Sequence, residues 1–296
     1  MNMRERDSVL AIAAAVLAGA GMAFAGSHGS IRVNGLPLFA LLVAFAFVIQ
    51  WLAFIPAFFL RTEKFFDITG SMTYITVMVI AVAVSLDLDG RSILLLVLVL
   101  IWAVRLGSFL IHRIHAAGKD VRFDEIKPSF FRFLLTWTLQ GLWVTFTAAA
   151  ALVAITTTTR KTLGPYAAIG LLVWLFGFSI EVVADTQKRR FRASPENRGK
   201  FINTGLWARS RHPNYFGEIV LWIGVAIIAL PVLRGWQFAA LASPIFVMLL
   251  LTRVSGVPVL EQRADSRWGG SDDFEAYKTR TPVLIPRLTR HVPTER

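Results

Sequence analysis

The chain has 296 residues, 55% of them hydrophobic, and its mean hydropathy of +0.58 is too apolar for an ordinary soluble domain. It has no cysteine, which excludes disulfides, zinc thiolates and a thiol nucleophile. The formal net charge of +12 is compatible with nucleic-acid binding, but in membrane proteins basic residues mark cytoplasmic loops and anionic headgroups. The composition therefore predicts an integral membrane protein that binds the lipid bilayer and no nucleic acid.

Eight apolar stretches are long enough to cross a bilayer, which needs about 20 residues per helix. They lie near residues 8–26, 36–60, 68–86, 92–112, 130–155, 165–184, 213–230 and 236–252. The predicted fold is all-α, a polytopic membrane helix bundle of about 7–8 transmembrane helices.

The first stretch also has features of a signal peptide, because Arg4 and Arg6 precede an Ala-rich run with a candidate cleavage site near residues 23–25. The charge distribution favours its retention as an extra N-terminal transmembrane helix within residues 1–30. If eight spans alternate from a cytoplasmic N-terminus, the outside loops hold few basic residues: Arg32, Arg91, Arg160, Lys161 and Arg234. The positive-inside rule then predicts that both termini are cytoplasmic.

Residues 185–218 form the longest polar interruption of the apolar sequence. Their basic side chains are Lys188, Arg189, Arg190, Arg192, Arg198, Lys200, Arg209 and Arg211. A helix beginning at Pro213 would direct free N–H groups and the positive end of its dipole toward this stretch. The pattern predicts a site for a phosphorylated ligand at the cytoplasmic face.

Two further features are unusual for a passive bundle. Arg105 lies in the middle of a span, where a charge usually faces a cavity or partner, although it could also reach the interface. The C-terminal tail mixes acids, bases and the aromatic residues Trp268, Phe274 and Tyr277. We expect this tail to fold over the cytoplasmic mouth of the bundle, with a helix lying on lipid headgroups as the alternative.

The five histidines do not have the spacing of a metal site, so no metal is predicted. The sequence also lacks a Gly-rich dinucleotide loop and a Walker loop. Any nucleotide would therefore have to be held by the bundle itself.

Three motifs carry a resemblance to a known family: RHPNYFGE at 211–218, ADTQKRRFR at 184–192 and FEAYKTRTPVLIP at 274–286. Together they resemble a membrane superfamily that includes steroid 5-alpha reductases, sterol C14 reductases and prenylcysteine carboxyl methyltransferases. The chain is most similar to a bacterial branch related to the steroid 5-alpha reductases. This resemblance implies a multi-pass protein of the bacterial inner membrane, with a reductase-like domain over 31–296 and a cofactor-binding half over about 165–290.

The resemblance also implies NADPH as the cofactor and assigns residues to it. The implied cofactor-binding residues are Arg105, Arg113, Asp185, Arg192, Arg211, His212, Asn214, Tyr215, Glu218 and Tyr277. Clustered arginines suit a 2′-phosphate and a pyrophosphate, which they hold by charge-assisted hydrogen bonds. Lys188, Arg189 and Arg190 are interpreted as charges that set membrane topology.

The substrate residues depart from the family pattern. Gln50 is present, but Trp51 and Trp102 stand where the steroid enzymes have a glutamate and a tyrosine. Asp67 and Tyr74 are seven residues apart and can share one helix face, so Gln50, Asp67 and Tyr74 are the candidate catalytic residues. The alternative is that Glu63 and Asp67 only pair with Arg61 and Lys64.

The resulting hypothesis is an NADPH-dependent reductase, an oxidoreductase acting on a C=C bond of a steroid, isoprenoid or other lipophilic small molecule. The alternative is an S-adenosylmethionine-dependent membrane methyltransferase of the prenylcysteine methyltransferase type. A transporter or lipid-binding bundle is a third interpretation, which explains the basic stretch less well.

Overall fold

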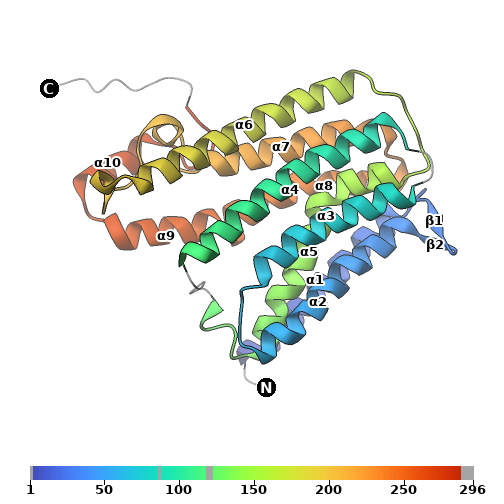
Figure 1. Cartoon of the computed structure of the whole chain (residues 1–296), viewed down its shortest axis with the longest axis horizontal. Helices are drawn as coiled ribbons and strands as arrows, with labels where there is room; N and C mark the ends of the chain where they lie inside the picture. The colour runs from blue at the N-terminus through green and yellow to red at the C-terminus, as the bar shows by residue number, and fades with distance from the viewer. Residues whose placement is uncertain (1–2, 86–87, 118–122, 288–296) are drawn as a thin grey trace. The chain divides into compact units, whose positions relative to one another are not determined.

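The computed structural model describes residues 3–85, 88–117 and 123–287, without the side chains of residues 3–4 and 109–117. It confirms an all-α membrane bundle, because eight helical segments of the described chain are long and apolar enough to cross a membrane. Figure 1 shows the helices in chain order. The long helices are α1 (Met3–Gly26), α2 (Leu38–Phe59), α3 (Phe66–Val84), α4 (Gly90–Ala117), α5 (Phe130–Thr156), α6 (Pro165–Ala193) and α7 (Pro213–Ala229).

The eighth candidate span, Gly235–Trp268, is broken into several pieces. It comprises a 3-10 helix η5 (Gly235–Leu241), α8 (Ala242–Leu249), a π-helical turn η6 (Leu250–Val254) and α9 (Val257–Trp268). The last helix, α10 (Asp272–Arg280), follows. π-Helical turns are rare and are often found at functional sites.

Strand structure in the described residues is limited to one small hairpin. Strands β1 (Arg32–Val33) and β2 (Leu36–Pro37) pair antiparallel. Asn34 and Gly35 have positive φ angles of 48° and 83°, which the tight turn of a two-residue hairpin requires.

The chain divides into two compact units, which are described separately. Unit 1 comprises Met1–Ala168 and Val225–Ser243, and unit 2 comprises Ile169–Gly224 and Pro244–Arg296. Exposed apolar side chains occur in both units, including Leu17, Phe59 and Leu172 at 71%, 79% and 67% exposure. Such surfaces suit contact with lipid.

Helix α5 is the centre of unit 1. Its residues from Ala148 to Ile155 are essentially inaccessible, and α1, α2, α3 and α4 all contact this helix. The small side chains of this Ala-rich segment allow neighbouring helices to approach closely. At the other end of α5, Phe133 and Trp137 pack in an aromatic cluster with Phe54 and Phe123.

In unit 2, α6 and α7 run side by side (Figure 1), and their backbones approach at glycines. A Cβ atom on Gly217 would lie 2.6 Å from the carbonyl oxygen of Gly177 and 2.7 Å from the backbone nitrogen of Glu181. A Cβ atom on Gly224 would be equally close to the backbone of Gly170 and Trp174. These glycines fix the separation of the two helices.

Helix α6 is longer than the predicted span of 165–184. It continues to Ala193, so the beginning of the basic stretch is helical. Gln, Lys and Arg are good helix formers, and the helix ends just before Ser194-Pro195, where proline disfavours helical geometry in the preceding residue. Lys188 and Arg192 are therefore one turn apart on a single helix.

The close approach of α6 and α7 predicts that Gly217→Ala destabilises the protein by about 1–3 kcal/mol, because the added methyl group forces the two backbones apart. Gly21→Ala is the matched control, since a Cβ there meets nothing within 4 Å. Melting curves of the purified variants should show a lower midpoint for Gly217→Ala alone. Equal midpoints would contradict the packing described for α6 and α7.

Candidate functional site

A basic cavity of about 290 Å³ lies entirely within unit 2. It is lined by the end of α6, by the segment 200–212, and by α9 and α10. Glu261 is the acidic side chain among the lining residues, whereas the basic ones are Lys188, Arg192, Lys200, Arg211, Arg263 and Arg267. The cavity therefore carries a large excess of positive charge, which favours an anionic ligand.

Two helices supply most of these cations in the same way. Lys188 and Arg192 are four residues apart on α6, and Arg263 and Arg267 are four residues apart on α9. Residues at this spacing lie on one face of a helix. Each helix thus turns one basic face toward the cavity.

Trp207 is a buried aromatic residue of the cavity wall. The ammonium group of Lys188 lies 4.3 Å from the centroid of its ring, within the range of a cation–π interaction. The indole N–H of Trp207 donates to the carbonyl of Ala184 at 3.0 Å. The Tyr277 hydroxyl donates to the Trp207 carbonyl at 2.8 Å, and burial raises the pKa of Tyr277, so this hydroxyl stays protonated as a donor.

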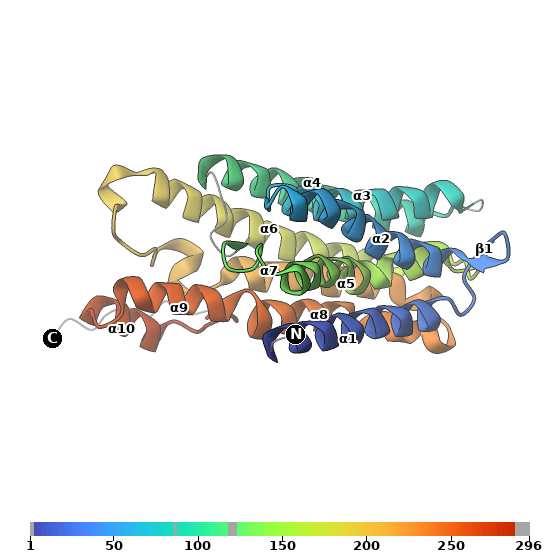
Figure 2. The same cartoon turned by 90° about the horizontal axis from the view of Figure 1, so that it is seen from below.

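Further aromatic rings surround Tyr277. The ring of Phe201 packs 5.2 Å from that of Tyr277 and 5.1 Å from that of Phe274, measured between centroids. Trp268 contacts both Phe201 and Phe274 at 6.0 Å. Figure 2 shows α9 and α10 together at the C-terminal end, where Lys278 of α10 pairs with Asp265 of α9 at 2.8 Å. The cavity therefore combines apolar ring faces with basic side chains.

The C-terminal segment holds the basic RHP motif in place. The backbone N–H groups of Arg211 and His212 donate to the carbonyls of Pro282 and Val283 at 2.9 and 3.0 Å. The Ser210 hydroxyl donates to the carbonyl of Leu284 at 2.8 Å. The tail thus packs on this motif and contributes walls of the cavity through α9 and α10.

Glu261 contacts the side chains of two consecutive residues of the motif. Its Oε2 is ion-paired with Nη1 of Arg211, and its Oε1 lies 2.7 Å from Nε2 of His212. Burial lowers the pKa of His212 below its ordinary value, although the hydrogen bond to Glu261 acts in the opposite direction. The imidazole is therefore neutral at pH 7 and stacks on the ring of Tyr215, with centroids 5.6 Å apart.

Two polar atoms of this cluster have no hydrogen-bond partner within the described part of the chain. They are Nδ1 of His212 and Nε of Arg211, and both are buried. Buried polar atoms are nearly always paired, so these two are available to hydrogen-bond a ligand or water in the cavity.

The structure brings together part of the predicted cofactor set. Arg192, Arg211, His212 and Tyr277 line the basic cavity. Asp185 precedes Lys188 by one turn of α6, and Asn214, Tyr215 and Glu218 lie in the first turns of α7.

The remaining two predicted cofactor residues belong to unit 1. Arg105 and Arg113 are both on α4, and the side chain of Arg113 is outside the described residues.

Sequence reasoning missed several cavity residues. Lys188 was interpreted as a topology charge, yet it lines the cavity and lies over Trp207. Its spacing of four residues from Arg192 was the available signal. Glu261, Arg263 and Arg267 of the C-terminal tail also line the cavity, but the sequence does not single them out, because nothing in it connects α9 to the RHP motif.

The candidate catalytic residues are all in unit 1. Gln50 is completely buried, and its amide Nε2 donates to Oγ1 of Thr73 at 2.8 Å. Thr73 also lines a cavity of about 400 Å³ between α2 and α3, together with Phe45, Ile49, Ala53, Ile68, Thr69, Met72 and Thr76. This lining is mostly apolar and suits a lipophilic molecule.

Tyr74 lies next to Trp102 of α4. Its ring packs edge-on against Trp102 with centroids 5.1 Å apart, and its hydroxyl is 3.5 Å from the carbonyl of Trp143. Asp67 is in the first turn of α3. The sequence-based alternative pairs Glu63 with Arg61 or Lys64. In the structure, the Glu63 carboxylate forms an ion pair with Lys127 at 2.6 Å.

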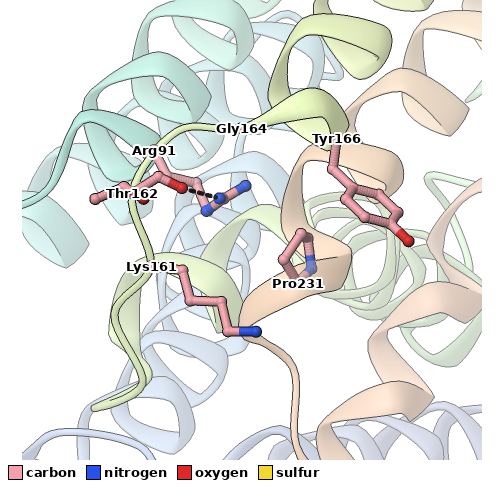
Figure 3. A pocket seen from close by; sticks show the side chains of 6 residues that line it. All are labelled: Arg91, Lys161, Thr162, Gly164, Tyr166 and Pro231. Carbon is pink, nitrogen blue, oxygen red and sulfur yellow. Dashed lines mark hydrogen bonds between the residues drawn. The ribbon is translucent and has the colours of Figure 1, made fainter.

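A third cavity, of about 310 Å³, is lined by Arg91, Lys161, Thr162, Gly164, Tyr166 and Pro231 of unit 1 (Figure 3). The guanidinium of Arg91 donates to the carbonyls of Ile228 and Thr162 at 2.5 and 3.0 Å. Arg91 therefore joins three segments of the backbone. Because the Arg91 guanidinium already donates to these backbone carbonyls, it has fewer N–H groups left for a ligand. The third cavity is therefore less suited to a polyanion than the basic cavity of unit 2.

Comparison with known proteins identifies the family. A family described as "Protein of unknown function (DUF1295)" matches residues 53–281, which is more than half of the chain. The chain belongs to this family, which is steroid 5-alpha reductase-like.

The chain is also similar to individual proteins. It is 29% identical over 156 residues to the probable O-methyltransferase ustE of Ustilaginoidea virens, covering 43% of this chain and 55% of that protein. It is 29% identical over 119 residues to 3-oxo-5-alpha-steroid 4-dehydrogenase 1 of Bos taurus, and 30% identical over 120 residues to that of Mus musculus. Both of these matches cover 40% of this chain and 41% of the relative. The chain thus spans about half the length of the curated relatives it matches.

The lowered pKa of His212 predicts a pH dependence of stability. Below the ordinary histidine pKa of about 6.5, the unfolded chain binds a proton that the folded imidazole does not, so stability falls as the pH drops. The melting midpoint should therefore decrease between pH 7.5 and 5.5, and His212→Gln should show a smaller decrease. The same replacement at His28, which does not line the basic cavity, is the control. An unchanged pH dependence in His212→Gln would contradict the burial of a neutral His212.

Proposed function

We propose that this protein is a membrane-embedded, NADPH-dependent reductase that acts on an activated C=C bond of a steroid, isoprenoid or other lipophilic substrate. The observation that carries this proposal is the basic cavity of unit 2, in which six cations and one carboxylate surround aromatic ring faces. The relatives named 3-oxo-5-alpha-steroid 4-dehydrogenase support the same reaction class. We place the cofactor-binding half at about 165–290, within a reductase-like domain over 31–296.

The charge of the cavity distinguishes between the two cofactor hypotheses. NADPH carries a pyrophosphate and a 2′-phosphate, so its charge complements the lining of Lys188, Arg192, Arg211 and their neighbours. S-adenosylmethionine carries a cationic sulfonium group and no phosphate. A cavity with this excess of basic groups repels such a ligand more than it attracts it. The electrostatics therefore favour a phosphorylated dinucleotide.

The residues present fit this cofactor. Arg192 and Arg211 would hold phosphate oxygens, and the faces of Trp207 and Phe201 would cover planar rings. His212 would accept a hydrogen bond from a ligand group through its unpartnered Nδ1. When bound, NADPH supplies the hydride that reduces the substrate's C=C bond.

The substrate residues proposed in unit 1 have separate roles. Gln50 would polarise a substrate carbonyl, and the Tyr74 hydroxyl would donate the proton, with Asp67 as a further candidate acid. The adjacent apolar cavity between α2 and α3 would receive the lipophilic part of the substrate. We also propose that both termini face the cytoplasm of a bacterial cell, where NADPH is available, and that residues 1–30 are an extra span.

A methyltransferase that uses S-adenosylmethionine is the second candidate function. The observation that favours it is the similarity to the probable O-methyltransferase ustE, which covers 43% of the chain. The aromatic wall of the cavity would also accept a sulfonium group through cation–π contacts.

Ligand-induced stabilisation separates these candidates. NADPH at micromolar concentration should raise the melting midpoint of the purified protein, whereas NADH should raise it less and S-adenosylmethionine should leave it unchanged.

Arg192→Ala should weaken NADPH binding about tenfold or more, because one charge-assisted contact is lost.

Arg190→Ala is the matched control for this measurement, since Arg190 is an exposed cation on the same helix that does not line the cavity. It should change NADPH affinity by less than about threefold, as expected for a screened surface charge. Stabilisation by S-adenosylmethionine alone would overturn the reductase proposal.

Tyr74→Phe should lower the turnover of a 4-en-3-one steroid or another enone substrate by about 100-fold, the usual loss on removing a general acid. NADPH affinity should stay the same. The rate is followed by the absorbance of the reduced nicotinamide, with Tyr166→Phe, an exposed tyrosine of unit 1, as the control. A rate equal to that of the wild type would remove Tyr74 from the mechanism.

A further inference from the structure

Among the described residues, Glu261 is the one carboxylate that lines the basic cavity, and each of its oxygens has a separate partner. Oε2 is ion-paired with Arg211, and Oε1 is 2.7 Å from Nε2 of His212. The Glu261 side chain is one-quarter exposed, whereas those of Arg211 and His212 are 16% and 5% exposed. Glu261 comes from α9, while Arg211 and His212 precede α7. This contact therefore joins two segments that are about fifty residues apart in sequence.

The contact determines which nitrogen of His212 carries the proton. An ionised carboxylate only accepts hydrogen bonds, so Nε2 must donate to Oε1 of Glu261. In the neutral imidazole the other nitrogen, Nδ1, is then an acceptor. That atom is buried and has no partner within the described residues. Glu261 thus defines the hydrogen-bonding character that His212 offers to a ligand.

The same contact restrains Arg211. One end of its guanidinium is taken up by Glu261, and its backbone N–H is bonded to the Pro282 carbonyl. The planar guanidinium has five N–H donors in a fixed arrangement, so fixing one of them orients the others. The buried Nε–H of Arg211 is among those that have no partner within the described chain.

We propose that Glu261 is a positioning residue of the basic cavity: it orients the Arg211 guanidinium and fixes the His212 tautomer so that both are ready to bind the phosphorylated cofactor. This inference rests on the proposed function, because it takes NADPH as the ligand. It adds a role for α9, since a residue of the C-terminal tail then determines how the RHP motif meets the ligand.

Positioning and simple charge balance predict opposite effects. If Glu261 only offset the positive charge of the cavity, removing its charge would strengthen the binding of an anionic cofactor. If it positions Arg211 and His212, removing it weakens binding although the cavity becomes more positive. The sign of the change in affinity therefore separates the two roles.

The test measures NADPH dissociation constants by equilibrium titration of the full-length protein in lipid nanodiscs. Glu261→Gln removes the charge with little change in shape, and Glu261→Asp keeps the charge but shortens the side chain by one methylene. Both variants should bind NADPH about five- to twentyfold more weakly, a loss typical of one displaced charged contact. Glu275→Gln, a change at an exposed carboxylate of α10 outside the cavity, should leave the affinity unchanged.

A double-mutant cycle tests whether Glu261 acts through Arg211. In the Arg211→Ala background, Glu261→Gln should weaken binding much less than in the wild type, since the group that it positions is gone. Additive effects in the cycle would overturn a positioning role through Arg211. Melting curves without ligand show whether each variant is folded. If Glu261→Gln does not fold, the affinity of Glu261→Asp still tests the inference.

The outcomes also separate this inference from the proposed function. If the wild type does not bind NADPH, the proposed function is wrong and the inference fails with it. If the wild type binds NADPH and Glu261→Gln binds it equally well or more tightly, only the positioning role is overturned.

Discussion

The concentration of positive charge around one cavity is the constraint on which the rest of unit 2 depends. Within the part of the chain that the structure describes, six basic side chains line this cavity and a single lining carboxylate offsets them. Like charges at such short range repel, so the folded scaffold must hold them together. Trp207 accepts the ammonium of Lys188 on its ring face, and Glu261 bridges Arg211 and His212. An anionic ligand would relieve the remaining repulsion, which is the physical basis of the proposed affinity for a phosphorylated cofactor.

The scaffold that holds these charges is rigid for identifiable reasons. Gly177, Gly217 and Gly224 bring the backbones of α6 and α7 into contact, which leaves little freedom for these helices to slide. The carbonyls of Pro282 and Val283 then fix the backbone of the RHP motif. Binding groups that are already in place lose less conformational freedom when a ligand arrives. The helix pair and the tail thus supply both the rigid frame of the cavity and several of its basic side chains, Lys188 and Arg192 from α6 and Arg263 and Arg267 from α9.

The sequence was sufficient for the bundle and for part of the site. The apolar spans were predictable because every backbone polar group in a bilayer must be satisfied internally, which leaves long helices as the solution. Arg192, Arg211, His212 and Tyr277, which the motifs assign to the cofactor, line the basic cavity, and their contact with a cofactor stays a prediction. Glu261 was not found, because its contact with Arg211 depends on how α9 returns to the motif. Lys188 was misread because a topology charge and a cavity charge look alike in a sequence until the helix is known to extend to Ala193.

The proposed function requires that NADPH binds in the basic cavity of unit 2. An electron cryomicroscopy structure of the protein in nanodiscs with NADPH tests this most directly. We predict density for the phosphates beside Arg192 and Arg211, with a ring of the cofactor against Trp207 or Phe201. Density for the cofactor at another site, with this cavity unchanged, would contradict the assignment of unit 2 as the cofactor-binding half.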